Sequence, residues 1–364
     1  MDEQEARAWL RLSRLELSPT IGRALVDKFG SAQAIFDATT SELRAVEKVT
    51  EDIIAKILGP APVAIESDLE LIQKLGVELV PITSENYPVN LRHVCDAPVL
   101  LYVRGRLVES DKMSIAIVGS RRASEYGLSV AEKLARDLAS SGLAIISGGA
   151  RGVDTAAHKG ALAAEGRTIA FLGCGVDVCY PPENRKLFEV ITKAGALVSE
   201  FPFGAPPEAW RFPPRNRLIS GMSLGVLVCQ SPAASGALIT AGYAAEQGKD
   251  VFAVPGNIDE ECNAGCHALI KDGAKLVECA DDVLLELGLE SKNDGSQQLR
   301  LPIESLTNDN ERKIASLLSL EPMHIDDIIE KTGLPAPLVA GTLTILEMKS
   351  IARRVPGNAY VRVL

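Results

Sequence analysis

The feature that most constrains the fold of this chain is a regular alternation, over residues 114 to 287, of short apolar runs and segments of helical length. Strands that are apolar on both faces need cover on both faces, which parallel sheets obtain from the helices of their crossover connections. The alternation therefore predicts an α/β domain with a doubly wound, Rossmann-like parallel sheet. Two further runs, at 77–81 and 96–105, are also expected to be strands. The strands expected within 114–287 read SIAIVGS, LAIISGG, RTIAFLGCG, GALVSEFP, LGVLVCQSP, DVFAVPGN and AKLVECA.

Glycine-rich turns follow the first two of these runs, at 118–122 (VGSRR) and 147–158 (SGGARGVDTAAH). Glycine between a strand and a helix permits positive φ and removes side-chain bulk, so main-chain N–H groups and a helix N-terminus can face an anion. In open α/β sheets such ligands bind beyond the carboxyl ends of the strands. The turns predict a phosphate-binding site, and leave open whether the phosphate belongs to a nucleotide or to a polymer. The residues expected there are Ser120, Arg121, Arg122, Gly148, Gly149 and Arg151.

Four segments are expected along the chain. Residues 1–60 carry short amphipathic segments and predict a small helical domain of helix-hairpin-helix or sterile-alpha-motif type. Such a unit either contacts a nucleic-acid backbone through its hairpin glycine, here Gly22, or serves as a packing module. Residues 66–288 form the Rossmann-like domain, 289–302 a flexible linker without hydrophobic periodicity, and 303–364 a C-terminal domain.

The C-terminal domain has the pattern of a winged helix. Segments 310–320, 325–332 and 335–348 predict three short helices, and IARRVPGNAYVRVL predicts a hairpin that turns at PGN. The third helix is accompanied by Lys349 as its single cation and holds no Arg, Asn or Gln to read base edges. This composition favours a protein-contact or regulatory role over the reading of DNA.

The net charge of −10 and the pI of about 5.1 argue against a protein that coats nucleic acid without specificity. A site for a polyanion would have to be built from arginines gathered in one place. No run of 18 apolar residues exists and the first residues are acidic, so we expect no membrane span, no signal peptide and a cytoplasmic location. The 7 cysteines lack the spacing of a zinc site or a disulfide framework, and neither a metal nor a cofactor is expected.

Two classes of nucleotide-binding enzyme use comparable glycine-rich turns. The GxGxxG spacing of dinucleotide-binding proteins is missing from VGSRRASEYG, and no Walker A sequence is present. Phosphoribohydrolases with a Rossmann-like fold place a catalytic Glu in a PGGxGTxxE stretch, where this chain has Thr240. Asp154, His158 and Glu200 stay open as acid or base groups. A phosphoribohydrolase-like enzyme acting on nucleotides is therefore the alternative function.

Aromatic and arginine side chains interleave between Glu200 and Arg217, in EFPFGAPPEAWRFPPRNR. Aromatic residues make up 4% of the whole chain, so this local concentration is informative. Single-stranded nucleic acid is bound by cations that follow its phosphates and by flat rings on which its bases stack. The stretch predicts such a site, with Phe212 as the stacking ring and Arg215 and Arg217 as phosphate contacts. The structural alternative is that Phe212 closes the core and both arginines are solvated at a helix start.

Six motifs, in order along the chain, resemble the DNA-processing protein A (DprA, also called Smf) family: VGSRR, SGGARGVDTAAH, GCGVDVCYPPEN, FPPRNRLISGMS, SGALITAGYAAEQGKDVFAVPGN and CHALIKDGA. The resemblance covers the whole Rossmann-like domain, and the flanking domains also fit a family architecture. It implies a nonenzymatic, cytoplasmic bacterial protein that binds and protects incoming single-stranded DNA. It further implies a homodimer that helps to load the RecA recombinase during natural transformation.

The resemblance also implies which residues form the DNA pocket. Two places depart from the family pattern. Ala209 stands where many members have a lysine, with Arg211 as the nearest cation that could replace it. Cys266 and His267 replace a small polar pair, with a structural effect expected. The pocket residues carried over from the family are Ser120, Arg121, Gly148, Gly149, Phe212, Arg215, Asn216 and Arg217.

Overall fold

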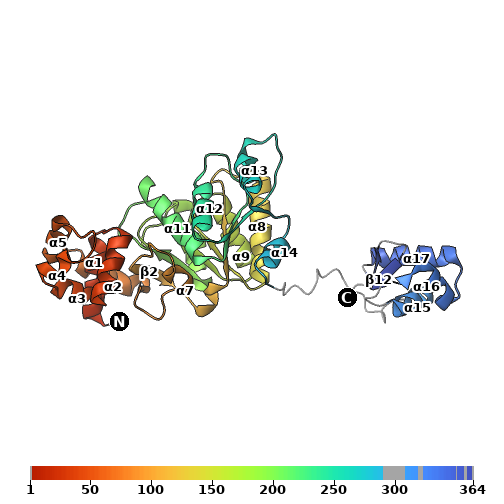
Figure 1. The fold of residues 1–364 in the computed structure, drawn as a ribbon, viewed down its shortest axis with the longest axis horizontal. Coiled ribbons are helices and arrows are strands. Elements are labelled where there is room, and N and C mark those ends of the chain that lie inside the picture. Colours follow the sequence, from red (N-terminus) through yellow and green to blue (C-terminus); the bar gives the residue numbers. More distant parts are fainter. Residues whose placement is uncertain (1, 290–307, 319–322, 350, 356–358, 363–364) are drawn as a thin grey trace. The chain divides into compact units, whose positions relative to one another are not determined.

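A computed structural model of the protein describes residues 2–289, 308–318, 323–349, 351–355 and 359–362. The chain divides into two units, Met1–Lys292 and Asn293–Leu364. The first unit contains a helical N-terminal part and a large α/β sheet, and the second is a small domain rich in helix (Figure 1). Within the described ranges, no helix is long and apolar enough to cross a membrane.

The N-terminal part is a bundle of short helices whose starts are fixed by polar caps. Asp2 accepts a hydrogen bond from the N–H of Glu5, and Ser18 and Ser31 cap the next two helices in the same way. Leu10 of the first helix is fully buried in the bundle. The helical N-terminal region expected from the sequence is therefore confirmed. Its helices are α1 (Glu3–Arg14), α2 (Pro19–Phe29), α3 (Ala32–Asp37), α4 (Thr40–Arg44) and α5 (Glu51–Leu58), followed by α6 (Ile65–Leu75).

The bundle packs against the α/β part through the residue that the sequence suggested as a hairpin glycine. Gly22 lies inside α2 and is buried, and a Cβ at this position would come within 3.3 Å of Val99 Cγ1. Close by, the hydroxyl of Tyr102 donates a hydrogen bond of 2.9 Å to Ser13 Oγ. The interpretation of Gly22 as a nucleic-acid contact in a hairpin is wrong, because helix packing uses the glycine.

The α/β part is built on one sheet that has nine strands among the described residues. The strands are β1 (Val77–Pro81), β2 (Leu100–Gly105), β3 (Ser114–Val118), β4 (Ala144–Ser147), β5 (Thr168–Phe171), β6 (Ala196–Ser199), β7 (Gly225–Val228), β8 (Asp250–Ala253) and β9 (Lys275–Leu276). Their order is β1-β2-β6-β5-β4-β3-β7-β8-β9. The strands from β6 to β9 in this order pair in parallel, as the alternation predicts.

The two strands before residue 114, for which the sequence predicts no direction, form an antiparallel edge of the sheet. β1 pairs with β2, and β2 with β6, in antiparallel register. The segment that joins β1 to β2 holds only the short helix α7 (Val89–Arg92), whereas a parallel crossover usually carries a full helix across the sheet. The sheet is therefore mixed: the parallel strands predicted within 114–287 are confirmed, and the two additional strands pair in antiparallel register at one edge.

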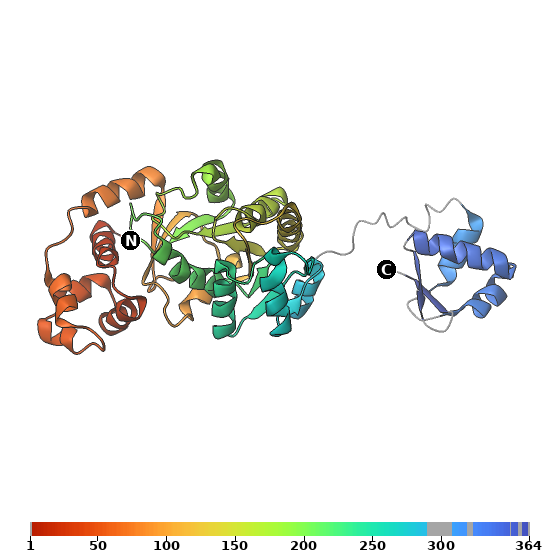
Figure 2. The same ribbon diagram turned by 90° about the horizontal axis from the view of Figure 1, so that it is seen from above.

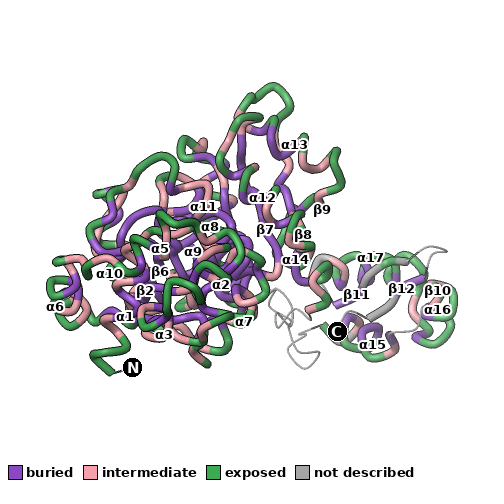
Figure 3. Tube along the Cα trace, turned by 60° about the vertical axis from the view of Figure 1, so that its left-hand side comes forward, coloured by how far each residue is buried: buried purple, intermediate pink, exposed green. Residues whose placement is uncertain are grey.

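Helices cover both faces of the sheet, and each face has its own core (Figure 2). They are α8 (Glu125–Ser140), α9 (Val153–Ala163), α10 (Arg185–Ala194), α11 (Phe212–Met222), α12 (Gly236–Glu246), α13 (Ala264–Lys271) and α14 (Ala280–Glu286). Successive strand residues point to opposite faces. Ile115 and Ile117 accordingly share a core with α8, α9 and α14, whereas Ala116 and Val118 share one with α10, α11 and α12. Figure 3 shows β2, β6 and β7 buried between these layers. The doubly wound prediction is confirmed.

The strand order reverses at β3, which lies between β4 and β7. The chain builds the sheet outward from β3 to β6, then returns to the other side of β3 and continues with β7. At such a switch point the loops after the two central strands run apart and leave a crevice beyond their carboxyl ends. Both glycine-rich turns follow strands at this place, because 118–122 follows β3 and 147–158 follows β4.

The second unit is a winged helix, as the sequence predicts. Ile314, Ile328, Val339 and Leu343 form its core, one or more from each helix. Its strands have the order β10-β12-β11 in the part of the chain that is described. Of the predicted linker 289–302, all but Leu289 lies outside the described residues, and so does the predicted PGN turn. The elements are α15 (Asp309–Leu317), β10 (Met323–His324), α16 (Ile325–Thr332), α17 (Ala336–Met348), β11 (Ala352–Val355) and β12 (Ala359–Arg362).

Candidate nucleic-acid interface

A cleft of about 980 Å³ lies at the switch point, beyond the carboxyl ends of β3 and β7. Its walls come from the turn after β3, the start of α9, the first turns of α11 and the start of α12. In sequence these segments are far apart, and the topology brings them to one edge of the sheet. Six of the ten residues expected in the site line this cleft: Ser120, Arg121, Arg122, Phe212, Arg215 and Asn216.

Arg121 and Arg122 are the exposed cations of the cleft. Neither forms an ion pair with any described residue, and both side chains are open to solvent. The guanidinium carbon of Arg121 lies 5.0 Å from the centroid of the Phe212 ring, which is cation–π distance. The turn is held in shape by Ser120, whose Oγ accepts a hydrogen bond of 3.1 Å from the N–H of Arg122. Two positive charges are thus held on a fixed turn and are free to meet an anion.

The ring of Phe212 lies between cations at the start of α11. It is half-buried and packs on Gly173, where a Cβ would come within 2.9 Å of the ring. The ring of Tyr180 lies 5.9 Å away at a tilt of 52°. On the cleft side Arg121 flanks the ring, and Arg215 lies 5.6 Å from its centroid. The ring is therefore supported from below and lines an open cavity, whereas Phe201 is buried.

Arg215 is buried under the cleft and joins the ends of two strands. Its Nη1 donates to the carbonyl oxygens of Gly148, at 2.6 Å, and of Phe171. Its Nε donates to Asn216 Oδ1 at 3.2 Å. Burial lowers the pKa of Arg215 to about 10, and the nearby carboxylate of Asp154 raises it, so the side chain keeps its charge at neutral pH. Arg215 contributes a positive charge to the floor of the cleft while it holds β4 and β5 in place.

The second glycine-rich turn is engaged mainly with the protein itself. Gly149 and Gly152 have φ of +66° and +75°, a conformation that favours glycine. Gly152 packs so tightly on the first turn that a Cβ would lie 2.2 Å from the carbonyl oxygen of Ser120. The Asp154 carboxylate accepts a hydrogen bond of 3.2 Å from the N–H of Ala150. The two turns therefore form one unit, with the first turn facing the cleft.

Arg151 and Arg217 are found outside the cleft lining. Arg151 is half-exposed and forms an ion pair with Glu183. Arg217 is 2% exposed, with its Nε 3.0 Å from Asp96 and its Nη2 2.5 Å from Glu200. Direct phosphate contact by Arg217 stays a prediction, and its burial between two carboxylates favours a structural role.

The departure at position 209 is not compensated by Arg211. Ala209 lines the cleft, but Arg211 is 5% exposed and points away from it. Its guanidinium pairs with Glu16 of the helical bundle and stacks 4.3 Å from the ring of Trp210. The suggestion that Arg211 replaces the family lysine is wrong, because the side chain is committed to the contact between the bundle and the sheet.

The groups considered for acid–base chemistry do not converge. Glu200 is paired with Arg217 away from the cleft. His158 lies in the core, with Nδ1 2.7 Å from Thr168 Oγ1, and burial lowers its pKa to about 3. Of the three groups, Asp154 alone lines the cleft, and burial raises its pKa.

Two residues of the site were missed by sequence reasoning. Gln230 follows β7, and its backbone carbonyl accepts a hydrogen bond of 2.7 Å from the N–H of Ser120. Its side chain accepts from the N–H of Ser124 at 2.8 Å, so it holds the first turn from both ends. Tyr180 lines the cleft beside Phe212. Tyr180 could have been noticed as the single aromatic residue of the motif GCGVDVCYPPEN. Its contact with Phe212 could not, because only the fold brings the two rings together.

Comparisons with known families and proteins cover both units. Residues 78–288 match the model of the family described as DNA recombination-mediator protein A, and residues 300–358 match that of the DprA winged helix domain. Protein Smf of Synechocystis is 33% identical over 400 residues, which cover 100% of both chains. Protein Smf of Escherichia coli is 39% identical over 82% of this chain and 81% of its own length.

Solved structures with a similar fold include two DNA processing proteins. The X-ray structure of DNA processing protein A from Streptococcus pneumoniae has a TM-score of 0.63 at 35% identity, and covers 77% of this chain and 97% of its own. A structure of DNA processing protein A from Helicobacter pylori, which concerns the single-stranded DNA binding mode of that protein, has a TM-score of 0.52 at 30% identity. It covers 58% of this chain and 95% of its own.

Proposed function

This chain belongs to the DNA recombination-mediator protein A (DprA/Smf) family, and from that membership we propose that it binds single-stranded DNA in the cleft at the switch point. The observation that carries the proposal is the placement of Arg121 5.0 Å from the ring of Phe212 in an open cleft. A cation beside an aromatic ring offers neighbouring places for a phosphate and for a base, which is how single strands are bound without sequence preference. The single-stranded DNA binding of the Helicobacter pylori relative supports the same assignment.

In this proposal each element of the cleft has a defined role. A base stacks against Phe212, and the phosphates on either side of it meet the exposed guanidinium groups of Arg121 and Arg122. Arg215 adds positive potential from the floor of the cleft, and Asn216 fixes the orientation of Arg215 through its Oδ1. Because the whole chain has a net charge of −10, binding depends on this local group of arginines.

We extend the proposal to what happens to the strand after binding. The protein holds and protects the strand without cutting it, acts as a homodimer in the cytoplasm, and passes the strand to the RecA recombinase during natural transformation. The relatives named DNA processing protein DprA in Streptococcus pneumoniae and Bacillus subtilis support a role in DNA processing. Loading of the recombinase can be measured as the rate at which RecA filaments assemble on single-stranded DNA. This rate should rise when the protein is added.

Direct binding is the first test. Fluorescence anisotropy with labelled single-stranded and double-stranded oligonucleotides should give tight binding of the single strand that weakens as salt is raised. In parallel, a panel of nucleoside monophosphates is incubated with the protein and analysed for free base and ribose 5-phosphate. Release of free base without retention of any strand would overturn the proposal in favour of a phosphoribohydrolase.

A further inference from the structure

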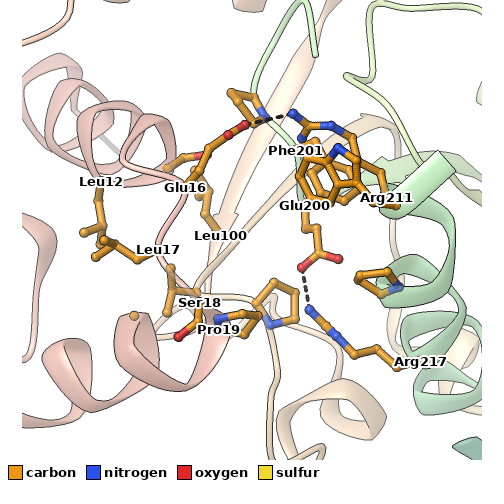
Figure 4. A pocket seen from close by; sticks show the side chains of 17 residues that line it. Leu12, Glu16, Leu17, Ser18, Pro19, Leu100, Glu200, Phe201, Arg211 and Arg217 are labelled. Atoms are coloured by element: carbon orange, nitrogen blue, oxygen red, sulfur yellow. Dashed lines mark hydrogen bonds and ion pairs between the residues drawn. The ribbon is translucent and has the colours of Figure 1, made fainter. Parts of the chain in front are cut away.

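A second pocket, of about 240 Å³, lies between the helical bundle and the sheet. One wall comes from α1, the α1–α2 turn and the start of α2, and the other from the ends of β2 and β6 and the first turns of α11 (Figure 4). The segment 209–217 separates it from the DNA cleft. Phe212 and Arg215 of this segment line the cleft, whereas Arg211 and Arg217 line the pocket.

The polar groups of this pocket are charged, buried and incompletely satisfied. Figure 4 shows the carboxylate of Glu200 between Arg211 and Arg217. Each arginine is paired through two of its nitrogens: Arg217 with Asp96 and Glu200, and Arg211 with Glu208 and Glu16. Even so, Glu200 Oε1, Arg211 Nη1 and Arg217 Nη1 are buried and have no hydrogen-bond partner among the described residues. Buried polar atoms are normally paired, so three unpaired atoms around one pocket call for an occupant.

The remaining walls of the pocket are apolar. Leu12, Leu17 and Pro19 face the charged side from the helical bundle, and Phe201 lies beside Arg211 (Figure 4). The volume is below the roughly 300–1,000 Å³ typical of sites for drug-sized ligands, so it suits one small planar group rather than an extended molecule. An occupant therefore needs flat apolar faces and an edge that combines hydrogen-bond acceptors with donors.

We propose that this pocket binds a guanine base. Guanine presents O6 and N7 as neighbouring acceptors, which arginine side chains recognise, and its 2-amino group and N1–H are donors. These three atoms are covered in this structure, so binding requires the side chains of Arg211, Arg217 and Glu200 to turn toward the pocket. The acceptors would then meet Nη1 of Arg211 or Arg217, and the 2-amino group would donate to Glu200 Oε1. A carboxylate beside guanidinium groups is selective for such a base, because cytosine and thymine lack the purine pair of acceptors.

Trp210 marks the side from which a base can enter the pocket, because it lines the pocket and is exposed to solvent. It is 56% exposed and packs edge-on against Phe201 with ring centroids 6.3 Å apart. The base comes either from a free guanine nucleotide or from a strand that leaves the DNA cleft and passes over the 209–217 segment. The second source rests on the proposed function, and the first does not.

Calorimetric titration of the full-length protein with GMP and IMP tests the pocket without DNA. IMP lacks the 2-amino group, so GMP should bind about tenfold more tightly, as expected for one hydrogen bond to a charged group. Glu200→Gln should remove most of this difference, and Val99→Phe, which fills the pocket, should abolish binding of both nucleotides. Circular dichroism and thermal melting establish that each variant is folded. Arg44→Ala, which removes an exposed arginine of the helical bundle that pairs with Glu51, is the matched control and should bind GMP like the native protein.

Oligonucleotides test the other source of the base. A thymine strand with one guanine should bind more tightly than an all-thymine strand, and Val99→Phe should remove this preference while keeping the binding of the all-thymine strand. Guanine preference in the strand without GMP binding supports the strand as the source. GMP binding in a protein that holds no strand supports the free nucleotide and contradicts only the proposed function. Absence of both GMP binding and guanine preference, or a GMP to IMP ratio that Glu200→Gln leaves unchanged, overturns the guanine pocket.

Discussion

Gly148 lies directly against the guanidinium group of Arg215. Nη1 of the arginine donates to the glycine carbonyl oxygen at 2.6 Å, and a Cβ on Gly148 would lie 2.4 Å from the same nitrogen. Gly148 belongs to a turn that the sequence predicts to bind phosphate. Its missing side chain instead leaves room for the buried guanidinium group of Arg215. Through this contact the second glycine-rich turn supports the floor of the cleft instead of facing the ligand.

Gly148→Ala should destabilise the protein and weaken binding of single-stranded DNA together, because the added methyl group displaces Arg215. Overpacking of this kind costs roughly 1–3 kcal/mol of unfolding free energy. Urea unfolding and fluorescence anisotropy measure the two effects. Gly242→Ala is the control, since Gly242 lies in α12 with nothing near its would-be Cβ, and it should be neutral or stabilising. Native stability of the Gly148→Ala protein would contradict this prediction, because the added methyl group would then fit beside Arg215.

Arg121→Ala should lower the affinity for single strands of every sequence and flatten the dependence of log K on log salt by about 0.7 unit, the value for one phosphate contact with a single strand. Arg122→Ala should act in the same way. Arg151→Ala is the comparison, because Arg151 pairs with Glu183 and does not line the cleft. If Arg151→Ala flattened the dependence of log K on log salt by the same amount, Arg151 would also contact a phosphate of the strand.

Phe212→Ala should cost about 1–3 kcal/mol of binding free energy if a base stacks on the ring. Phe212→Trp keeps a stacking surface and should retain most of the affinity. Anisotropy gives the binding free energies, and thermal melting of both variants reports any loss of packing against Gly173. A large drop in melting temperature with unchanged affinity per folded molecule would assign the ring to the core.

Much of this fold is predictable because apolar runs separated by helices leave few other arrangements than a covered parallel sheet. Strand direction at the β1–β2 edge is not predictable in this way, since Leu100–Gly105 is as apolar as the parallel strands and its partner is chosen by packing. The same limit applies to the arginines of FPPRNR. Arg215 and Arg217 look alike in sequence, and only the fold brings Asp96 and Glu200 to Arg217.

His158 makes the stability of the protein depend on pH. Its pKa is lowered from 6.5 to about 3, first by burial and then by the charge of Arg215. Between these values the unfolded chain binds a proton that the folded protein does not, so this residue lowers the unfolding free energy as the pH falls, by at most about 1.4 kcal/mol per pH unit. Burial raises the pKa of Asp154 and Glu200, which act with the opposite sign. Urea unfolding of the native protein and of His158→Gln at several pH values isolates the histidine: the slope against pH should be smaller in the variant, and equal slopes would contradict the lowered pKa.

Arg217 either serves the structure or contacts phosphate, and the Arg217→Met variant separates these two roles. If it serves the structure, Arg217→Met leaves Glu200 and Asp96 without their shared partner and should cost roughly 3–5 kcal/mol of unfolding free energy, as breaking a buried ion pair does. Adding Glu200→Gln should then recover part of the loss, because the buried charge is removed with its partner. Strand affinity, measured below the melting temperature of each variant, should stay near the native value. If Arg217 contacts phosphate instead, the single variant keeps its stability and loses affinity together with salt slope, and Glu200→Gln restores neither.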